Sequence, residues 1–217
     1  MCGKFSGMLS WSEMVAFAQP LPEAVENGND RLIIYRVMSA LPVIVWDHTT
    51  QSRRVVPMRW GFPKPTNWKI PQPIHARAET IDTIPAFADA FHAGQRGIVI
   101  AKNFNEAPES GEQFTITPGD EPFVALAFVW RRFAIPELPT PLLACVMATV
   151  PANALIASLP TDRMPAVLAE DDWAKWLDEK PCSAAEAKAC LKTVQGIRWR
   201  MAKEERPQKR ERAPTML

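Results

Sequence analysis

Residues 96–106 read RGIVIAKNFNE. The run from Gly97 to Phe104 is rich in β-branched and aromatic side chains, a composition typical of a buried strand. Glu106 stands where this strand is expected to end. Burial raises the pKa of a carboxyl group toward the range of a general acid, so we predict that Glu106 is a candidate proton-transfer group.

The same strand composition recurs along the chain and predicts a β-dominated core. The other predicted strands are residues 31–38, 42–46, 54–60, 113–117, 123–130 and 142–150. Helical patterns cover residues 14–18, 84–93, 152–159, 171–179 and 184–193, and residues 23–30 read as a loop. Capping boxes open the first helix at Ser10–Glu13 and the last at Ser183 with Glu186. Single helices at irregular spacing argue against βαβ winding, so the predicted fold class is α+β with peripheral helices.

Composition narrows the class of protein. The chain has 217 residues, and a hydrophobic content of 47% suffices for a buried core. A formal net charge of +1 excludes a generally basic coat for nucleic acid. The four cysteines show no CxxC spacing and there are three histidines, so we expect a reduced, cytoplasmic protein without metal or other cofactor. No apolar run is long enough to span a membrane.

The composition turns charged near the C-terminus, from Arg198 onward. Charged runs of this kind are usually solvated. We therefore predict one domain over residues 1–195 and a charged tail over residues 196–217.

Cys2 carries the most distinctive chemistry of the chain. Removal of Met1 would leave its amine and thiol on adjacent carbons, where an aldehyde can form a Schiff base with the amine and the thiol can then close a thiazolidine. The thiol can equally act alone as an acyl-transfer nucleophile. Gly3 lets a substrate approach closely, and Lys4 is expected to favour the ionised thiol. From these residues alone, an ordinary buried cysteine remains the alternative.

Basic and aromatic residues are interleaved between Arg53 and Arg77. The basic ones are Arg53, Arg54, Arg59, Lys64, Lys69 and Arg77, and the aromatic ones are Trp60, Phe62 and Trp68. This mixture suits single-stranded nucleic acid, because cations follow the phosphates while aromatic rings stack on unpaired bases. The alternative is a strand with an arginine-coated outer face and buried tryptophans.

Residues 75–80 read HARAET and follow the proline-rich approach Pro71–Pro73. An extended backbone would place His75, Arg77 and Glu79 on one face. Residues 161–165, TDRMP, lie in a tight connection between two predicted helices and show no mechanism of their own.

Together these segments resemble the SOS-response-associated peptidase family of abasic-site processing proteins. The family opens Met-Cys-Gly-Arg-Phe, and this chain opens MCGKF. The family also has a Trp-Gly pair before a tryptophan-containing loop, an Asn-Ala-Arg-x-Glu-Thr motif, a strand ending in glutamate, and Thr-x-x-Ala-Asn followed by His-x-Arg-Met-Pro. These resemble, in the same order, Trp60–Gly61 with Trp68, residues 75–80, residues 96–106, residues 149–153 and residues 161–165.

The resemblance implies a β-barrel-like core of mostly antiparallel strands. It also implies that Cys2, after autoproteolytic removal of Met1, captures abasic sites in single-stranded DNA as a thiazolidine crosslink, with peptidase and lyase activities. The catalytic positions it assigns are Cys2, His75, Glu106 and Thr161. The DNA-binding positions it assigns are Lys4, Trp68, Arg77, Thr149 and Arg163. The expected partner is single-stranded DNA with abasic sites, and the expected protein is a nucleoid-associated monomer.

Two of these positions depart from the family pattern. His75 replaces the family's motif asparagine, and Thr161 replaces its motif histidine. A threonine hydroxyl can hydrogen-bond but cannot replace imidazole as an acid or base. His75 is therefore the candidate to supply the lost imidazole, and we expect an impaired activity.

Two other functions remain open. The first is a degenerate module that binds single-stranded or damaged DNA without crosslinking it. The second is a glutamine amidotransferase of the N-terminal nucleophile class, which also begins Met-Cys-Gly. That class continues in a glycine-containing strand, whereas residues 4–7 are expected to lead into a helix.

Overall fold

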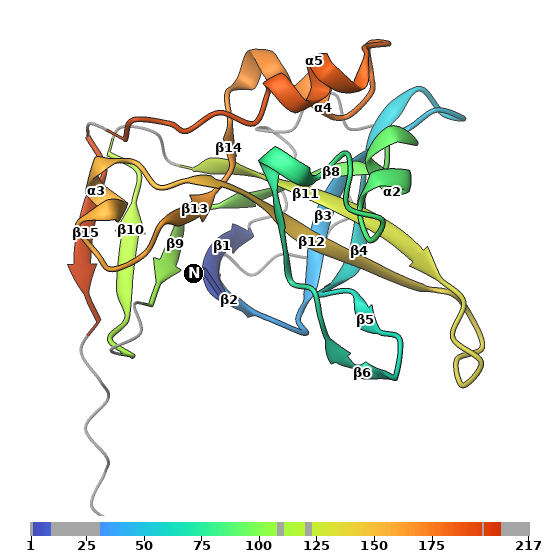
Figure 1. Ribbon diagram of the computed structural model, residues 1–217, viewed down its shortest axis with the longest axis horizontal. Helices are drawn as coiled ribbons and strands as arrows, with labels where there is room; N and C mark the ends of the chain where they lie inside the picture. Colours follow the sequence, from blue (N-terminus) through green and yellow to red (C-terminus); the bar gives the residue numbers. More distant parts are fainter. Residues whose placement is uncertain (1, 10–30, 108–110, 120–122, 197, 205–217) are drawn as a thin grey trace, which may run out of the picture.

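The computed structural model describes residues 2–9, 31–107, 111–119, 123–196 and 198–204. A ring of five strands forms its core (Figure 1). The strands are β3 (Ala40–Asp47), β4 (Ser52–Trp60), β8 (Arg96–Ala101), β11 (Val124–Phe133) and β12 (Leu142–Pro151). They are hydrogen-bonded in the order β12-β4-β3-β8-β11, and β11 pairs with β12 again, so the sheet closes on itself. All of these pairings are antiparallel except β4 with β12. The predicted barrel-like core is confirmed.

Short strands extend this sheet. They are β7 (His75–Arg77) and β13 (Arg163–Pro165), which pair with β12, and β14 (Val167–Leu168), which pairs with β11. A separate hairpin consists of β5 (Pro63–Lys64) and β6 (Asn67–Pro71).

A second sheet stands at one end of the barrel. Its order is β15 (Arg200–Lys203), β10 (Phe114–Thr117), β9 (Asn103–Glu106), β1 (Lys4–Leu9) and β2 (Arg31–Arg36), all antiparallel. Figure 1 shows the red β15 beside the green β10 and β9, with the chain's beginning next to β9. Residues 200–203 therefore belong to a sheet of the domain, which differs from the tail predicted over residues 196–217.

The predicted strand at residues 97–104 is divided between the two sheets. Its first part is β8 of the barrel and its second part is β9. The backbone N–H of Lys102, between them, donates to the Ser6 carbonyl at 2.8 Å. The division therefore carries the chain from the barrel into the second sheet and leaves Glu106 at the end of β9.

The prediction that residues 4–7 lead into a helix is wrong. They begin strand β1, which pairs with β2 on one side and β9 on the other. Phe5 explains the strand, because its ring lies in the core 5.3 Å from Trp60 and 5.3 Å from Tyr35, measured between ring centroids. Side chains alternate along a strand, so a buried Phe5 places Lys4 on the other face. The predicted helix at residues 14–18, its cap at Ser10–Glu13 and the loop at residues 23–30 lie outside the described residues.

The helices are short and peripheral. They are α2 (Ala88–His92), α3 (Ala154–Ala157), α4 (Trp173–Trp176) and α5 (Ala184–Ala189), with the 3-10 turns η1 (Ala78–Thr80) and η2 (Glu170–Asp172). Each α-helix is shorter than the pattern predicted. One reason is Pro85, which lies within the predicted helix at residues 84–93 and cannot donate a helical hydrogen bond. None of the helices in the described part of the chain is long and apolar enough to cross a membrane.

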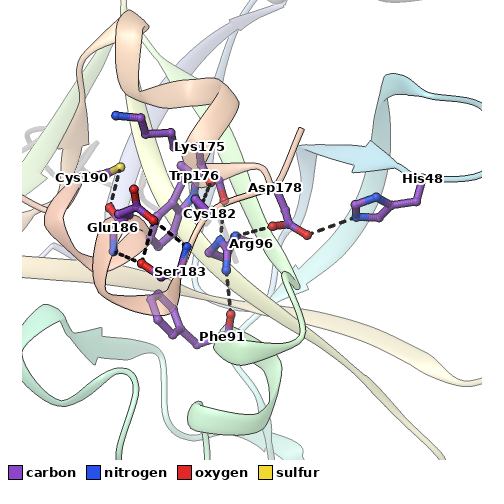
Figure 2. A network of polar contacts seen from close by, with 10 residues as sticks. All are labelled: His48, Phe91, Arg96, Lys175, Trp176, Asp178, Cys182, Ser183, Glu186 and Cys190. Carbon is purple, nitrogen blue, oxygen red and sulfur yellow. Dashed lines mark hydrogen bonds and ion pairs between the residues drawn. The ribbon is translucent and has the colours of Figure 1, made fainter. Parts of the chain in front are cut away.

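Arg96, a buried residue of β8, joins helices α2 and α4 to the barrel through hydrogen bonds (Figure 2). Its guanidinium donates to the carbonyl of Trp176 at 2.5 Å and to that of Phe91 at 2.8 Å, and it pairs with Asp178 at 3.1 Å. Figure 2 also shows His48 reaching Asp178 from the other side, at 3.4 Å. Since a buried cation is tolerated only when it is paired and hydrogen-bonded, this network is structural.

The capping box of α5 gives a test of local stability. Ser183 Oγ accepts the Glu186 backbone N–H, and the Glu186 carboxylate accepts the Ser183 backbone N–H at 2.8 Å. Ser183→Ala should lower the free energy of unfolding by about 1 kcal/mol, because it leaves a helix N–H without its acceptor. Ser158→Ala, which removes an exposed hydroxyl at the end of α3, is the control and should change stability by less than about 0.5 kcal/mol. Urea unfolding measures both, and equal effects would contradict the role of the cap.

Candidate active site around Cys2

Cys2 lies buried directly before β1, with 2% of its surface exposed. Its thiol donates to the Lys4 carbonyl at 3.3 Å and has a backbone hydrogen bond with Asn105 of β9. The pairing of β1 with β9 places Lys4 opposite Asn105, so the two strands together hold the thiol. The burial of Cys2 agrees with the alternative of an ordinary buried cysteine, and the two strands give its thiol a defined position.

His75 binds the backbone of Cys2. Its Nε2 lies 2.6 Å from the Cys2 carbonyl oxygen, and since a carbonyl can only accept, Nε2 carries the proton. Burial lowers the pKa of His75, so the ring is neutral near pH 7 with Nδ1 as an acceptor. Strand β7 pairs in parallel with β12, and this pairing places His75 opposite Met147.

Glu106 lies on the other side of the same residue. The carboxyl group is fully buried at the end of β9, and the nearby Cys2 backbone N–H favours its ionised form. Burial raises the pKa of this carboxyl to about 7, against an ordinary 4.5. This agrees with the shift expected from sequence. His75 thus binds the C=O of Cys2, and the Glu106 carboxyl lies beside the Cys2 N–H.

The thiol itself is protonated. Burial, and after it the negative charge of Glu106, raises the pKa of Cys2 to about 12. The expectation that Lys4 keeps the thiol ionised is wrong, because the Lys4 ammonium binds both oxygens of Glu204, at 2.8 and 2.6 Å. A reaction at Cys2 therefore needs a base that removes the thiol proton during bond formation.

Thr161 is bound within its own loop after α3. Its backbone N–H donates to the Leu159 carbonyl at 2.7 Å and its hydroxyl to the Arg163 carbonyl at 3.4 Å. Among the described residues, no hydrogen bond joins Thr161 to Cys2, His75 or Glu106. The structure therefore brings together three of the four predicted catalytic residues by direct contact.

The predicted DNA-binding residues divide into exposed and internal ones. Arg77 is exposed at the end of β7, and Trp68 is half-exposed on the β5–β6 hairpin, with Lys69 Nζ 5.9 Å from the centre of its ring. Arg163 is buried: its guanidinium donates to both Glu79 oxygens, at 2.6 and 2.9 Å, and to the Thr149 carbonyl at 2.6 Å. Thr149 is buried as well. Arg163 and Thr149 therefore hold β12, β13 and η1 together. The segment 75–80 stays extended only to Arg77.

The basic stretch from Arg53 to Arg77 is not one continuous face. Arg53 is buried in an ion pair with Glu179, and Arg54 pairs with Asp47 at 2.8 Å. Arg59 donates to the carbonyls of Gly61 and Trp68, while Trp60 and Phe62 lie in the core. In this first half Trp60 and Phe62 are buried, as the alternative expects, but the arginines do not coat one outer face, because successive residues of β4 point to opposite faces and Arg53 is buried.

The second half of the stretch borders a groove of about 840 Å³ between the β5–β6 hairpin and residues 133–137. Two aromatic rings, Trp68 and Phe133, line it together with Lys64 and Lys69. Its aromatic and cationic lining is that of a surface on which an unpaired base can stack.

Sequence reasoning did not single out Asn105 and Glu204. Asn105 precedes Glu106 in the same strand, and its backbone contact with the thiol follows from the β1–β9 pairing. Glu204 lies within the segment that read as a solvated tail. No local signal distinguishes it there, because its partners are 89 to 200 residues away along the chain.

The fold is a closed barrel joined to a second sheet, and a buried cysteine two residues before β1 lies between an imidazole and a carboxyl group. This combination defines a barrel protein with a cysteine-centred site. The chain belongs to the SOS response associated peptidase (SRAP) family, whose model matches residues 1–205.

Known relatives agree with this assignment. The abasic site processing protein YoqW of Bacillus subtilis is 26% identical over 192 residues, which cover 83% of this chain and 81% of that protein. A crystal structure of a Bacteroides thetaiotaomicron protein superposes with a TM-score of 0.78 at 20% identity, covering 94% of this chain and 92% of that one. A Bordetella bronchiseptica protein gives a TM-score of 0.76 at 18% identity, covering 94% and 100%. The two structures establish the fold.

The raised pKa of Glu106 predicts a pH dependence of stability. Its pKa is about 7 in the folded protein against 4.5 ordinarily, so the fold favours the protonated carboxyl. That contribution is complete below pH 4.5 and is lost as the pH rises through 7, a change of about 3 kcal/mol. The Glu106→Gln variant has no titrating group at this position and does not lose this contribution. As the pH rises from 4.5 through 7, its free energy of unfolding should therefore increase by about 3 kcal/mol relative to that of the wild type. Urea unfolding across the pH range measures the difference. Glu170→Gln on the surface is the control, and a difference that stays flat for Glu106→Gln would contradict the burial of the carboxyl.

Proposed function

We propose that this protein processes abasic sites in single-stranded DNA and that Cys2 captures the abasic sugar as a thiazolidine. The observation that carries the proposal is the position of Cys2 between two side chains: His75, whose Nε2 lies 2.6 Å from the Cys2 carbonyl oxygen, and Glu106, whose buried carboxyl acts on the Cys2 thiol through its charge. Membership of the SRAP family supports it, as does the 26% identity with an abasic site processing protein.

Release of Met1 comes first in this proposal. The Cys2 thiol attacks the carbonyl of the preceding residue, the new S–C bond replaces the C–N bond, and the Cys2 nitrogen takes up a proton. Glu106 suits this step, because it lies beside the Cys2 N–H and its pKa of about 7 lets it donate a proton near neutrality. Water then hydrolyses the thioester and frees the thiol.

Capture follows at the free amine. The amine attacks the C1′ aldehyde of the abasic sugar and one water leaves, giving an imine. The sulfur then bonds to the same carbon while the thiol proton passes to the nitrogen. A thiol with a pKa of about 12 does not ionise by itself at pH 7, so Glu106 acts as the base that accepts this proton and returns it.

DNA contacts in this proposal come from the exposed part of the basic stretch. Arg77 lies two residues from His75 on the same strand, and its side chain faces solvent. From there the DNA strand would continue to the groove beside Trp68, where Lys64 and Lys69 supply positive charge. Phosphate pairing and stacking give affinity without reading the base sequence.

The two departures from the family pattern fall on different steps. His75 uses its single N–H to hold the Cys2 carbonyl, so it orients the nucleophile and is neutral. Thr161 supplies a hydroxyl that does not titrate near neutrality. Strand elimination and reversal of the crosslink need protons delivered to leaving groups, and these steps lose the contribution of an imidazole, about 10² to 10⁴ in rate.

Thr161, which stands where the family has its motif histidine, favours one alternative function, a degenerate module that binds DNA without crosslinking it. For the glutamine amidotransferase alternative, the sequence argument against it fails, since residues 4–7 do form a strand. The match of residues 1–205 to the SRAP family now argues against it instead. Assaying free glutamine hydrolysis beside DNA crosslinking separates all three functions.

Cys2→Ala tests the role of the thiol. The variant should form no covalent adduct with abasic single-stranded DNA, while its non-covalent binding stays within a few-fold of the parent, because affinity resides in phosphate and stacking contacts. Denaturing electrophoresis reports the adduct and fluorescence anisotropy the binding. Cys145→Ala, which removes another buried thiol, is the control. Loss of binding together with crosslinking in Cys2→Ala alone would make Cys2 a structural residue.

Thr161→His and His75→Asn test the two departures. We expect Thr161→His to speed reversal of the crosslink, since it restores a group that titrates near neutrality. His75→Asn should keep a donor to the Cys2 carbonyl and change the rate of formation by less than about tenfold. Time courses of adduct formation and release measure both. If Thr161→His changes neither rate and His75→Asn abolishes both, His75 is the acid-base group and the slow reversal is not caused by Thr161.

A further inference from the structure

A second polar cluster lies beside Cys2 and is centred on Glu204. This residue directly follows β15, and its backbone N–H continues the pairing by donating to Gln113 at 2.8 Å. One carboxylate oxygen accepts from Lys4 Nζ at 2.8 Å, Asn105 Nδ2 at 2.6 Å and Thr115 Oγ1 at 2.9 Å. The other accepts from Lys4 Nζ at 2.6 Å.

The three donors form one row across the second sheet. Lys4 of β1 lies opposite Asn105 of β9, and Asn105 lies opposite Thr115 of β10. Residues directly opposite one another in neighbouring strands place their side chains on the same face. The sheet therefore presents an ammonium, an amide and a hydroxyl at one point, and the carboxylate of Glu204 occupies that point.

Two residues of this row, Lys4 and Asn105, also contact the Cys2 thiol through their backbones. The carbonyl of Lys4 accepts the Cys2 thiol at 3.3 Å, and the backbone of Asn105 bonds to the same thiol. An anion bound by the side chains of Lys4 and Asn105 therefore lies next to the residue that reacts with DNA.

The donor set suits phosphate as well as carboxylate. Lysine, asparagine and threonine side chains are common donors to phosphate oxygens in DNA complexes. Hydrogen bonds between an ammonium and an anion are stronger than neutral ones, and the hydrogen bond from Lys4 holds the pKa of Glu204 below its ordinary value. The carboxylate is thus ionised at neutral pH and cancels the charge of Lys4.

We propose that Glu204 is an internal latch that fills a phosphate-binding position, and that a phosphodiester of the DNA backbone displaces it when DNA binds next to Cys2. This inference rests on the proposed function. The Lys4 side chain is 13% exposed and that of Glu204 32%, so solvent reaches the pair from the Glu204 side. Competition of this kind lowers the affinity for DNA while the latch is in place, and it couples DNA binding to release of the end of β15.

Glu204→Gln is the direct test. It removes the negative charge and keeps an oxygen that can accept from Asn105 and Thr115, so the sheet retains its contacts. Binding of a fluorescent oligothymidylate without abasic sites is measured by anisotropy at several salt concentrations. We expect Glu204→Gln to bind about fivefold more tightly than the wild type. We also expect its salt dependence to steepen by about one ion, because Lys4 then releases a counterion on binding phosphate.

Glu112→Gln is the matched control. Glu112 lies just before β10 and pairs with Lys203 of β15, and 41% of its side chain is exposed. The Glu112→Gln variant also removes one negative charge from this edge of the sheet, but it leaves the ion pair between Lys4 and Glu204 in place. It should therefore change the affinity for DNA by less than about twofold. Adding Lys4→Gln to Glu204→Gln should abolish the gain. Hydrogen exchange at residues 200–204 should accelerate when DNA binds the wild type.

The outcomes separate this inference from the proposed function. If the wild type binds DNA and Glu204→Gln binds no more tightly than Glu112→Gln, the latch is wrong and the proposed function stands. Weaker binding by Glu204→Gln, with an unchanged melting temperature, also overturns the latch and makes Glu204 a support for the bound conformation. If none of the proteins binds the oligothymidylate, both proposals fail.

Discussion

The position of Cys2 between His75 and Glu106 is the constraint on which the rest of the site depends. His75 donates to the Cys2 carbonyl at 2.6 Å, so the residue cannot turn without breaking this hydrogen bond, and the buried Glu106 carboxyl lies beside the Cys2 N–H. An unmade hydrogen bond in a buried site costs about 1 to 3 kcal/mol. The thiol and the nitrogen of Cys2 therefore keep one orientation relative to the Glu106 carboxyl.

The two sheets supply the two sides of this constraint. His75 belongs to β7, which is fixed to the barrel by its parallel pairing with β12, whereas Glu106 ends β9 of the second sheet. Phe5, packed against Trp60 of the barrel, joins the strand that follows Cys2 to the same core. Burial at this junction gives Glu106 its raised pKa and keeps the thiol protonated, so one feature of the packing sets both properties.

Much of the barrel and part of the site could be predicted from sequence. β-branched runs located the strands of the ring, and the glutamate after residues 96–105 was recognised as a buried carboxyl. Strand β1 was missed because the short segment Lys4–Leu9 shows no clear alternation of apolar and polar residues, and its pairing with β2 and β9 is not local. The same limit applies to Glu204, whose role depends on three other strands. Composition between Arg53 and Phe62 suggested a DNA surface, yet burial and ion pairing there depend on which face each residue of β4 takes.

The central claim is that both the amine and the thiol of Cys2 bond to the sugar, and peptide mass spectrometry of the adduct tests it most directly. The protein is incubated with abasic single-stranded DNA, denatured, treated with iodoacetamide and digested. The account predicts an N-terminal peptide that begins at Cys2, carries the sugar with loss of one water, and is not alkylated at its thiol. A sugar adduct whose Cys2 thiol is alkylated would be an open imine and would contradict the thiazolidine. The absence of any adduct at Cys2 would contradict the proposed enzymatic function as a whole.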